Sequence, residues 1–337
     1  MSAASADVIV HPASWAPLTA FAAALFAVWW LARGRLSALV LDHPNPRSLH
    51  EGPMPRTGGL GLHAGAQLAL AILAPNLPAA LWAAFVVLLL VSFWDDVRGI
   101  PAAARLAAHL AVCALFVAAV LPREYGMLPA AAAALAIAWM ANLYNFMDGS
   151  DGLAGGMALI GFSTYGTAAW LAGSSEFALV NFCIAAAAAA FLVFNFHPAR
   201  IFLGDAGAVP LGFLAAALGM IGWLQGDWTW WFPALVFAPF IADASVTLAR
   251  RCLRREKVWQ AHREHYYQKL VRLGWGHRRT ALAEYALMAA SGVLALVALA
   301  LPAGLQAVLL AGAAGAYLLI MVSIERAWAG RAEGRNG

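Results

Sequence analysis

The residues best suited to chemistry in this sequence are aspartates beside long apolar runs. Asp95 and Asp96 are adjacent at the end of one run, Asp148 and Asp151 lie between two runs, and Asp205 opens another. Carboxylates gathered at one edge of a helical protein can hold a divalent cation, move a proton or orient a phosphate. Their common position at run ends therefore predicts a single acidic site.

Helix capping is the alternative explanation for each of these acids. An aspartate at a helix N-terminus is favoured by side-chain hydrogen bonds and by the helix dipole, which could account for Asp151 and Asp205. The same dipole disfavours Asp95 and Asp96, which follow their apolar run and so need a cation. Oxygen ligands without a thiolate favour Mg²⁺, or Mn²⁺, over Zn²⁺. We predict Asp205 as the first metal ligand and Asp148 as a second.

Spacing divides the work among these side chains. Adjacent helical residues project about 100° apart, so one of Asp95 and Asp96 is expected to bind metal while the other takes a proton. Asp148 and Asp151 are three residues apart, with Asn145 one turn earlier on the same face. Glycines within this segment let the backbone approach a ligand closely, which is typical of a phosphate or nucleotide cradle.

A second polar stretch runs from Asn195 to Gly207. Within it, Arg200 could neutralise a phosphate, and the sequence Gly204-Asp205-Ala-Gly207 predicts a helix N-terminus that attracts anions. A carboxylate at such an end competes with a phosphate unless a metal bridges the two. This competition is the reason for choosing Asp205 as the metal ligand.

Two basic loops carry further candidates. The first contains Arg47, His50 and Arg56 among prolines and paired glycines, a texture that a simple membrane anchor does not explain, so we expect it to contact substrate. The second, 250–279, contains His262 and His265 on one helical face beside a tyrosine. These histidines are expected to meet a diphosphate, as neutral donors or as cations.

One further acid lies inside an apolar run. A charge at that depth in a membrane is costly, so Asp243 needs a partner. An arginine of loop 250–279 and a place in the polar cleft are equally good explanations, and both stay open.

The elements that must position these residues are membrane helices. Hydrophobic residues make up 63% of the 337 positions, charged residues 11%, and the mean hydropathy is +0.74. No soluble core could bury that much apolar surface, and runs of about 17–21 residues match the thickness of a bilayer. We predict about eleven transmembrane helices, over 13–32, 58–74, 78–94, 102–121, 127–143, 152–172, 177–194, 205–223, 231–250, 280–300 and 303–323.

The basic residues predict the orientation. With the N-terminus in the periplasm and the C-terminus in the cytoplasm, only Arg123 of the 21 basic residues lies outside, as the positive-inside rule requires. The net charge of +4 is therefore a topology signal rather than a nucleic-acid surface. No basic residue precedes the first apolar run, which argues for a retained first helix. We expect one membrane-embedded domain over 1–337, with a motif-bearing core at about 40–280 and a C-terminal helix pair at about 280–323.

Five segments, taken together and in order, resemble the polyprenyl-phosphate N-acetylhexosamine-1-phosphate transferases of glycosyltransferase family 4. The matching segments are Pro44-Asn45-x-Arg47-x-x-His50 with Pro55-Arg56-x-Gly58-Gly59, Trp94-Asp95-Asp96, Asn142-x-x-Asn145-x-x-Asp148-Gly-x-Asp151-Gly, Asn195-x-x-Pro198-Ala199-x-x-Phe202-x-Gly204-Asp205-x-Gly207, and the histidine loop.

The resemblance implies an enzyme of the bacterial inner membrane with its active site facing the cytoplasm. Such an enzyme transfers an N-acetylated sugar 1-phosphate from a UDP-sugar to undecaprenyl phosphate, with Mg²⁺, and releases UMP. By position, Asp205 would bind metal, Asp95 would deprotonate the lipid phosphate and Asp96 would assist. The implied substrate-binding residues are Arg47, His50, Arg56, Asn142, Asn145, Asp148, Asp151, Asn195, Arg200, His262 and His265.

The loop details resemble the branch that initiates O-antigen or capsule glycans. The form Arg-Ser-x-His at 47–50 and the sequence His-x-x-His-Tyr-Tyr-Gln differ from the peptidoglycan translocase, which typically has a lysine in the first loop and three consecutive histidines. Ser48 stands where many relatives have lysine, which leaves Arg47 and Arg56 as candidate phosphate partners. Ala208 replaces a common serine and removes one hydroxyl.

Two other functions compete with this one. A transporter with an aspartate relay would place its acids at mid-membrane depth, where only Asp243 is expected. A phosphotransferase acting on CDP-activated lipids also uses Asp-Gly motifs, but with an Ala-Arg pair and acids four apart that 148–151 lacks. The sequence does not choose among GlcNAc, GalNAc, QuiNAc and FucNAc, and it leaves the oligomeric state, including a homodimer, open.

Overall fold

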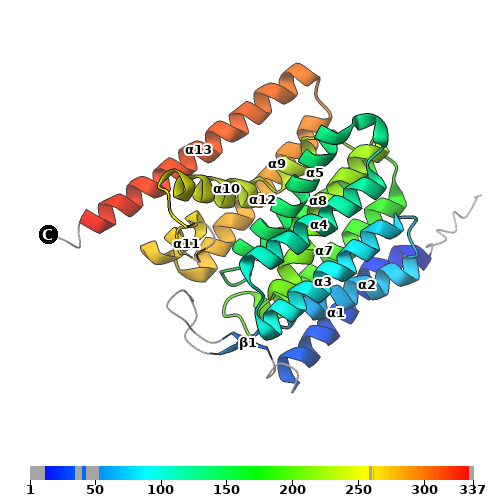
Figure 1. The fold of residues 1–337 in the computed structure, drawn as a ribbon, viewed down its shortest axis with the longest axis horizontal. Coiled ribbons are helices and arrows are strands. Elements are labelled where there is room, and N and C mark those ends of the chain that lie inside the picture. The colour runs from blue at the N-terminus through cyan, green and yellow to red at the C-terminus, as the bar shows by residue number, and fades with distance from the viewer. Residues whose placement is uncertain (1–11, 35–39, 43–52, 258–259, 261, 334–337) are drawn as a thin grey trace, which may run out of the picture.

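The protein is a bundle of long helices with one small hairpin at an end of the bundle (Figure 1). The computed structural model describes residues 12–34, 40–42, 53–257, 260 and 262–333. Two predicted substrate contacts, Arg47 and His50, lie outside these residues.

The helices and strands follow the apolar runs of the sequence. The two short strands pair antiparallel, with Leu41 opposite Pro55. The elements are η1 (Pro12–Trp15), α1 (Ala16–Arg33), β1 (Leu41–Asp42), β2 (Met54–Pro55), α2 (Gly58–Leu73), α3 (Ala79–Arg98), α4 (Ala102–Val120), η3 (Arg123–Tyr125), α5 (Met127–Phe146), α6 (Leu153–Leu171), α7 (Ser175–Asn195), α8 (Asp205–Gln225), α9 (Phe232–Val236), α10 (Ala238–Leu253), α11 (Tyr266–Leu270), η4 (Val271–Trp275), α12 (Gly276–Leu299) and α13 (Ala303–Glu333).

Every apolar run predicted to span the membrane is helical. Among the described residues, eight helical segments are long and apolar enough to cross a membrane, and α2 is a shorter apolar helix. The prediction of an all-α, multi-pass membrane protein is confirmed. The count of eleven spans and the side on which each terminus lies stay predictions.

The run 231–250 is not one continuous helix. It is divided into α9 and α10 at Phe237, and a proline stands near the start of each part, Pro233 and Pro239. Proline has no N–H to donate to the preceding turn and its ring clashes with the carbonyl four residues earlier, so a helix breaks before it.

The bundle is built around α8. Of the 18-residue apolar stretch in each helix, 83% is buried inside the protein for α8 and 61% for α7, against 6% for α13. Helix α8 packs against α3 and α5, whereas α13 runs along one side of the bundle (Figure 1). Many of the buried positions in α7 and α8 are Ala or Gly, which lets neighbouring backbones approach closely. The most enclosed helix thus begins at Asp205.

A tight turn joins α3 to α4. Gly99 adopts a φ of 72°, a conformation that L side chains rarely adopt, and Pro101 precedes the first turn of α4. This short connection brings the first turn of α4 back beside the last turn of α3. Arg105 consequently lies next to Asp95.

A backbone clamp joins two segments that are far apart in the sequence. The amides of Gly58 and Gly59 donate to the carbonyls of Phe202 and Leu203, each at 2.9 Å. A Cβ on Gly59 would lie 2.2 Å from the Cα of Gly207, so no larger residue fits there. The paired glycines are required by this close approach, which places Arg56 beside the start of α8.

Candidate active site

Three carboxylates and two arginines meet where α3 ends and α8 begins. This carboxylate cluster comprises Asp95, Asp96, Asp205, Arg56 and Arg105. Arg105 is ion-paired with Asp95, and its Nη1 lies 3.3 Å from an oxygen of Asp205. Arg56 lies 3.5 Å from Asp205 and 3.8 Å from Asp96. The cluster contains three of the residues predicted for catalysis and metal binding.

Asp96 caps helix α8 from outside the helix. Its carboxylate accepts hydrogen bonds from the backbone amides of Asp205, at 3.2 Å, and Ala206, at 2.9 Å. The anion that we expected at this helix N-terminus is therefore a side chain of α3. Because the amides of a helix N-terminus favour negative charge, they stabilise Asp96 as a carboxylate.

Asp95 faces different partners. Its carboxylate pairs with Arg105 and accepts the backbone amide of Ile100 at 2.6 Å. We inferred a metal partly because two acids at a helix C-terminus need a cation. Arg105 and Arg56 are cations beside these two acids, and the metal stays a prediction.

Asn145 extends the cluster onto α5. Its Nδ2 donates to Asp205 at 3.1 Å, at the same oxygen that Arg105 approaches. One turn deeper on the same two helices, His109 Nδ1 lies 3.2 Å from Asn142 Oδ1. Asn142 therefore joins α4 to α5 beneath the cluster and, within the described residues, makes no hydrogen bond to it.

Asp151 belongs to a separate histidine pair. Its carboxylate lies 2.7 Å from His197 Nδ1 and 3.8 Å from His277 Nδ1, and it accepts the amide of Ala199 at 3.2 Å. The two imidazole rings are parallel, with centroids 5.6 Å apart. The pair ties the α5–α6 segment to the start of α12. Asp148 lies on that segment, and its charge acts on Tyr267.

Asn195 and Arg200 hold the loop before α8. Asn195 is buried, accepts the amide of Gly152 at 3.0 Å and donates to the carbonyl of Ile201 at 2.9 Å. Arg200 donates to the carbonyl of Val193 and lies over the ring of Phe194. Asn195 is thus committed to protein contacts, while Arg200 is exposed.

The histidine loop packs on the segment that carries Asn145. The ring of His265 stacks on Phe146 at 6.5 Å, and the hydroxyl of Tyr267 donates to the carbonyl of Phe146 at 3.2 Å. A Cβ on Gly149 would lie 2.1 Å from that hydroxyl, so this glycine admits the tyrosine. His262 lies against His265, with ring centroids 4.9 Å apart.

His262 is neutral at physiological pH. Burial lowers its pKa to about 4, and the neighbouring His265 and Arg251 act in the same direction. Of the two states that we considered for this histidine, the neutral donor or acceptor is therefore the one that meets a ligand at pH 7.

Among the described residues, Asp243 is partnered by the histidine loop and not by an arginine. Its carboxylate accepts His265 Nδ1 at 3.1 Å and the backbone amides of Tyr266 and Tyr267 at 2.9 and 3.0 Å. It therefore holds the histidine loop from below and caps the short helix α11.

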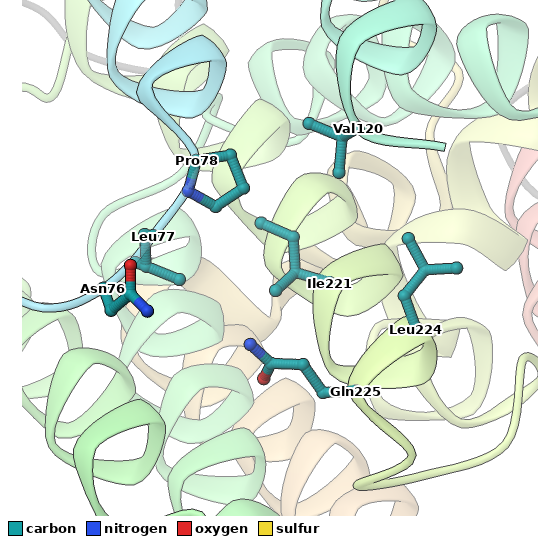
Figure 2. Close-up of a pocket in the computed structure, with 7 residues that line it drawn as sticks. All are labelled: Asn76, Leu77, Pro78, Val120, Ile221, Leu224 and Gln225. Atoms are coloured by element: carbon teal, nitrogen blue, oxygen red, sulfur yellow. The ribbon is translucent and has the colours of Figure 1, made fainter. Parts of the chain in front are cut away.

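A cavity of about 370 Å³ lies at the other end of the bundle (Figure 2). Its lining residues come from the α2–α3 connection, the end of α4 and the end of α8, whereas the carboxylate cluster lies at the end of α3 and the starts of α4 and α8. The cavity has no charged side chain in its lining, and it is distinct from the cluster. Its lining residues are Asn76, Leu77, Pro78, Val120, Ile221, Leu224 and Gln225.

The cluster is suited to Mg²⁺ by the chemistry of its donors. In the described part of the chain, no group of three or more His, Cys, Asp or Glu side chains could hold one ion. Mg²⁺ does not require such a cage, because it keeps several waters and binds through one or two carboxylates together with substrate phosphates. Asp205 offers hard oxygen atoms beside an amide and two guanidinium groups, which fits that mode.

Sequence reasoning missed four residues of the site. Arg105 was counted only as a topology signal, and His109, His197 and His277 were not considered. The spacing of ten residues between Asp95 and Arg105, across a glycine and a proline, could have indicated that pair. Nothing in the sequence pairs His197 with His277.

Known proteins share the segments that build this site. A model of glycosyl transferase family 4 matches residues 78–223, which hold Asp95, Asp96, Asn145, Asp148 and Asp205. A protein of Bacillus subtilis (strain 168) named "probable undecaprenyl-phosphate N-acetylglucosaminyl 1-phosphate transferase" is 27% identical over 262 residues, which are 73% of each chain.

Two further relatives are named phospho-N-acetylmuramoyl-pentapeptide-transferase. That of Levilactobacillus brevis is 30% identical over 44% of this chain and 45% of its own length, and that of Lactobacillus delbrueckii is 35% identical over 40% and 41%. Over residues 78–223, which include the start of α8, the chain is therefore similar to glycosyl transferase family 4.

Proposed function

We propose that the protein transfers an N-acetylated sugar 1-phosphate from a UDP-sugar to undecaprenyl phosphate and releases UMP. The observation that carries this proposal is the carboxylate cluster, in which Asp95, Asp205 and two arginines converge on one helix N-terminus. Phosphoryl transfer requires positive charge around a diphosphate and a base near the attacking oxygen, and this arrangement offers both.

The arginines would bind the phosphates. Arg56 and Arg105 both reach Asp205 and remain partly exposed, so a phosphate entering the cluster can share their N–H groups with the carboxylates. The sequence offered Arg47 and Arg56 as phosphate partners. Arg47 lies outside the described residues, and we propose Arg56 for this role.

Asp95 would remove the proton from the lipid phosphate. Unlike Asp96 it does not cap α8, and a neighbouring guanidinium keeps it in the charged form that can accept a proton. Asp96 would act indirectly, by fixing the position of Asp205 through the first turn of α8.

Mg²⁺ would be held by Asp205, with Asp148 and the diphosphate as further ligands. When bound, the ion neutralises charge on the diphosphate.

The sugar donor has two candidate classes. The Bacillus subtilis relative is named for N-acetylglucosaminyl 1-phosphate, and the lactobacillar relatives for phospho-N-acetylmuramoyl-pentapeptide. Initiation of an O-antigen or capsule glycan agrees with the first class, and a step of cell-wall synthesis with the second. The longer alignment supports the first.

One assay tests the proposal and separates the two classes. Purified protein in detergent, with Mg²⁺ and undecaprenyl phosphate, is incubated with UDP-GlcNAc, UDP-GalNAc, UDP-QuiNAc, UDP-FucNAc or UDP-N-acetylmuramoyl-pentapeptide, and UMP release is measured. We expect UMP from a UDP-N-acetylhexosamine only when the lipid is present. Folded protein that releases UMP from none of these donors contradicts the proposal.

A further inference from the structure

Asp243 is a carboxylate enclosed by hydrogen-bond donors on α10. Only 4% of the residue is exposed, and the backbone amides of Tyr266 and Tyr267, the hydroxyl of Thr247 and the ring of His265 all point at it. Backbone amides can only donate, so the carboxylate acts as an acceptor in each of these bonds. The carboxylate therefore holds the start of α11 and the ring of His265 against α10.

The bond from Asp243 fixes the tautomer of His265. In the tautomer that carries its proton on Nδ1, His265 donates to this carboxylate at 3.1 Å. The side chain of His265 also accepts the backbone amide of Gln268, in a capping box.

His265 is connected to the carboxylate cluster through α5. Its ring stacks on Phe146, the residue after Asn145, and Asn145 donates directly to Asp205. The two tyrosines whose amides Asp243 accepts follow His265 in the chain, so one carboxylate fixes both the loop and the ring. A histidine whose Nδ1 is held by a carboxylate keeps its ring in a constant orientation.

We propose that Asp243 is a positioning residue, which holds the buried ring of His265 through its Nδ1–H and so fixes the histidine loop beside the residues that would bind the diphosphate. This proposal rests on the proposed function for its kinetic test but not for its structural one. It assigns a structural role to Asp243, an acid that the transfer chemistry itself does not use.

A double-mutant cycle separates positioning from plain stabilisation. Asp243→Asn is expected to lower kcat/KM for UMP release roughly 10- to 100-fold in the otherwise unchanged protein, the range found when a partner of a ligating histidine is removed. In a His265→Ala background the same change is expected to lower it less than 2-fold further, because the residue through which Asp243 acts is gone. An equal loss in both backgrounds overturns the proposal.

Glu284→Gln on α12 is the matched control. Glu284 is a second acid inside an apolar helix, and within the described residues no hydrogen bond or ion pair joins it to His265. Replacing its carboxyl group by an amide is expected to leave kcat/KM unchanged. If the control loses as much activity as Asp243→Asn, the loss of any acid from these helices explains the effect and positioning does not.

A spectroscopic measurement needs no variant and no activity. Nitrogen-15 NMR of full-length protein with labelled histidine, with His265 assigned by comparison with His265→Gln, is expected to show a protonated Nδ1 at neutral pH. An Nε2–H tautomer with a bare Nδ1 overturns the proposal. Wild-type protein that gives the expected tautomer but no UMP contradicts the proposed function alone.

Discussion

At the scale of single residues, two neighbouring aspartates do different work. Asp95 and Asp96 are adjacent in α3, yet one is paired with the side chain of Arg105 and the other with the backbone of α8. The 100° step of a helix separates their directions. Substitutions at the two positions should therefore change different properties of the protein.

Asp95→Asn tests the proposed base. The amide cannot accept the proton of the lipid phosphate, so we expect turnover to fall about 100- to 10,000-fold, the usual contribution of a general base. The loss should persist at high pH, and UMP release measured from pH 6 to 9 checks this. Full turnover of the variant at high pH would remove Asp95 from this role. Asp227→Asn, at the opposite end of α8 and bonded to Ser174, is the matched control and should keep wild-type activity.

His262 predicts a dependence of stability on pH. Its pKa is about 4 in the folded protein against 6.5 for a free histidine, so between these values the unfolded chain binds a proton that the folded chain does not. Stability contributed by this group is therefore present above pH 6.5 and is lost as the pH falls toward 4. Thermal unfolding in detergent at pH 7.5 and 5 should show a smaller difference in His262→Gln than in the wild type. An equal difference in both proteins would mean that His262 does not carry this effect.

Sequence reasoning found the acids of the site but not their partners. The prediction that Asp95, Asp205 and Asn145 lie together agrees with the structure. It followed from a topology that placed the helix ends carrying these residues on one side of the membrane. Arg105 was missed since its charge already had an explanation, the orientation of the protein. Asp243 could not be resolved, because its donors are backbone amides, which no sequence pattern displays.

At the scale of elements, α8 depends on a cap supplied by α3. Helix N-termini are usually capped by a residue next to them in the chain, whereas Asp96 lies 109 residues before Asp205. The cap joins the enclosed helix of the bundle to the end of its neighbour. It converts a local requirement of one helix into a tertiary contact.

Asp96→Ala should reduce stability. The amides of Asp205 and Ala206 lose their acceptor, which costs about 0.5–2 kcal/mol in a helix cap. Reversible unfolding of the detergent-solubilised protein measures the loss. Asp96→Asn keeps one acceptor oxygen and is expected to lose less. Equal stability of Asp96→Ala and the wild type would show that the cap contributes nothing.

The bond between His109 and Asn142 should fix α4 against α5. Both side chains lie one turn below groups that reach Asp205, so a shift between these helices would separate Arg105 from Asn145. His109→Leu is expected to cost about 1–3 kcal/mol, because it leaves the Oδ1 of Asn142 buried without a donor. His109→Asn keeps a donor near the Nδ1 position and serves as the control in the same unfolding measurement. Equal losses in the two variants would assign the cost to the ring volume.

The helices themselves were predictable because the bilayer dictates their length and apolar character. Each predicted range is helical for that reason, although 231–250 forms two helices. The division of 231–250 at Phe237 was missed although Pro233 and Pro239 are visible in the sequence, since a proline near a helix start and a proline at a break look alike. Which helix would be enclosed was also beyond prediction, because α8 is no more apolar than α7.

At the scale of the whole molecule, the charges define the orientation. The carboxylate cluster, the histidine loop and the end of α10 should all face the cytoplasm if basic residues are retained there. Cys252 is exposed at the end of α10, while Cys113 and Cys183 are buried, so the native protein contains one accessible thiol in its described part.

Labelling of cysteines tests this orientation. A membrane-impermeant maleimide should modify Cys252 in inverted vesicles and not in intact spheroplasts. In a Cys252→Ser background, Glu124→Cys in the exposed turn η3 should show the reverse pattern. Labelling of Cys252 from outside would contradict the orientation and move the proposed active site to the periplasm.

The external cap of α8 also has a consequence for biosynthesis. Asp95 meets Arg105 almost as soon as both leave the ribosome, but the amides that Asp96 requires are made 109 residues later. At about 5–20 residues per second, this is a delay of roughly 5–20 s. During that interval the carboxylate of Asp96 lacks the backbone amides of α8, and Arg56 is the neighbour already made. Insertion of α8 beside α3 and α5 then assembles the carboxylate cluster in one event.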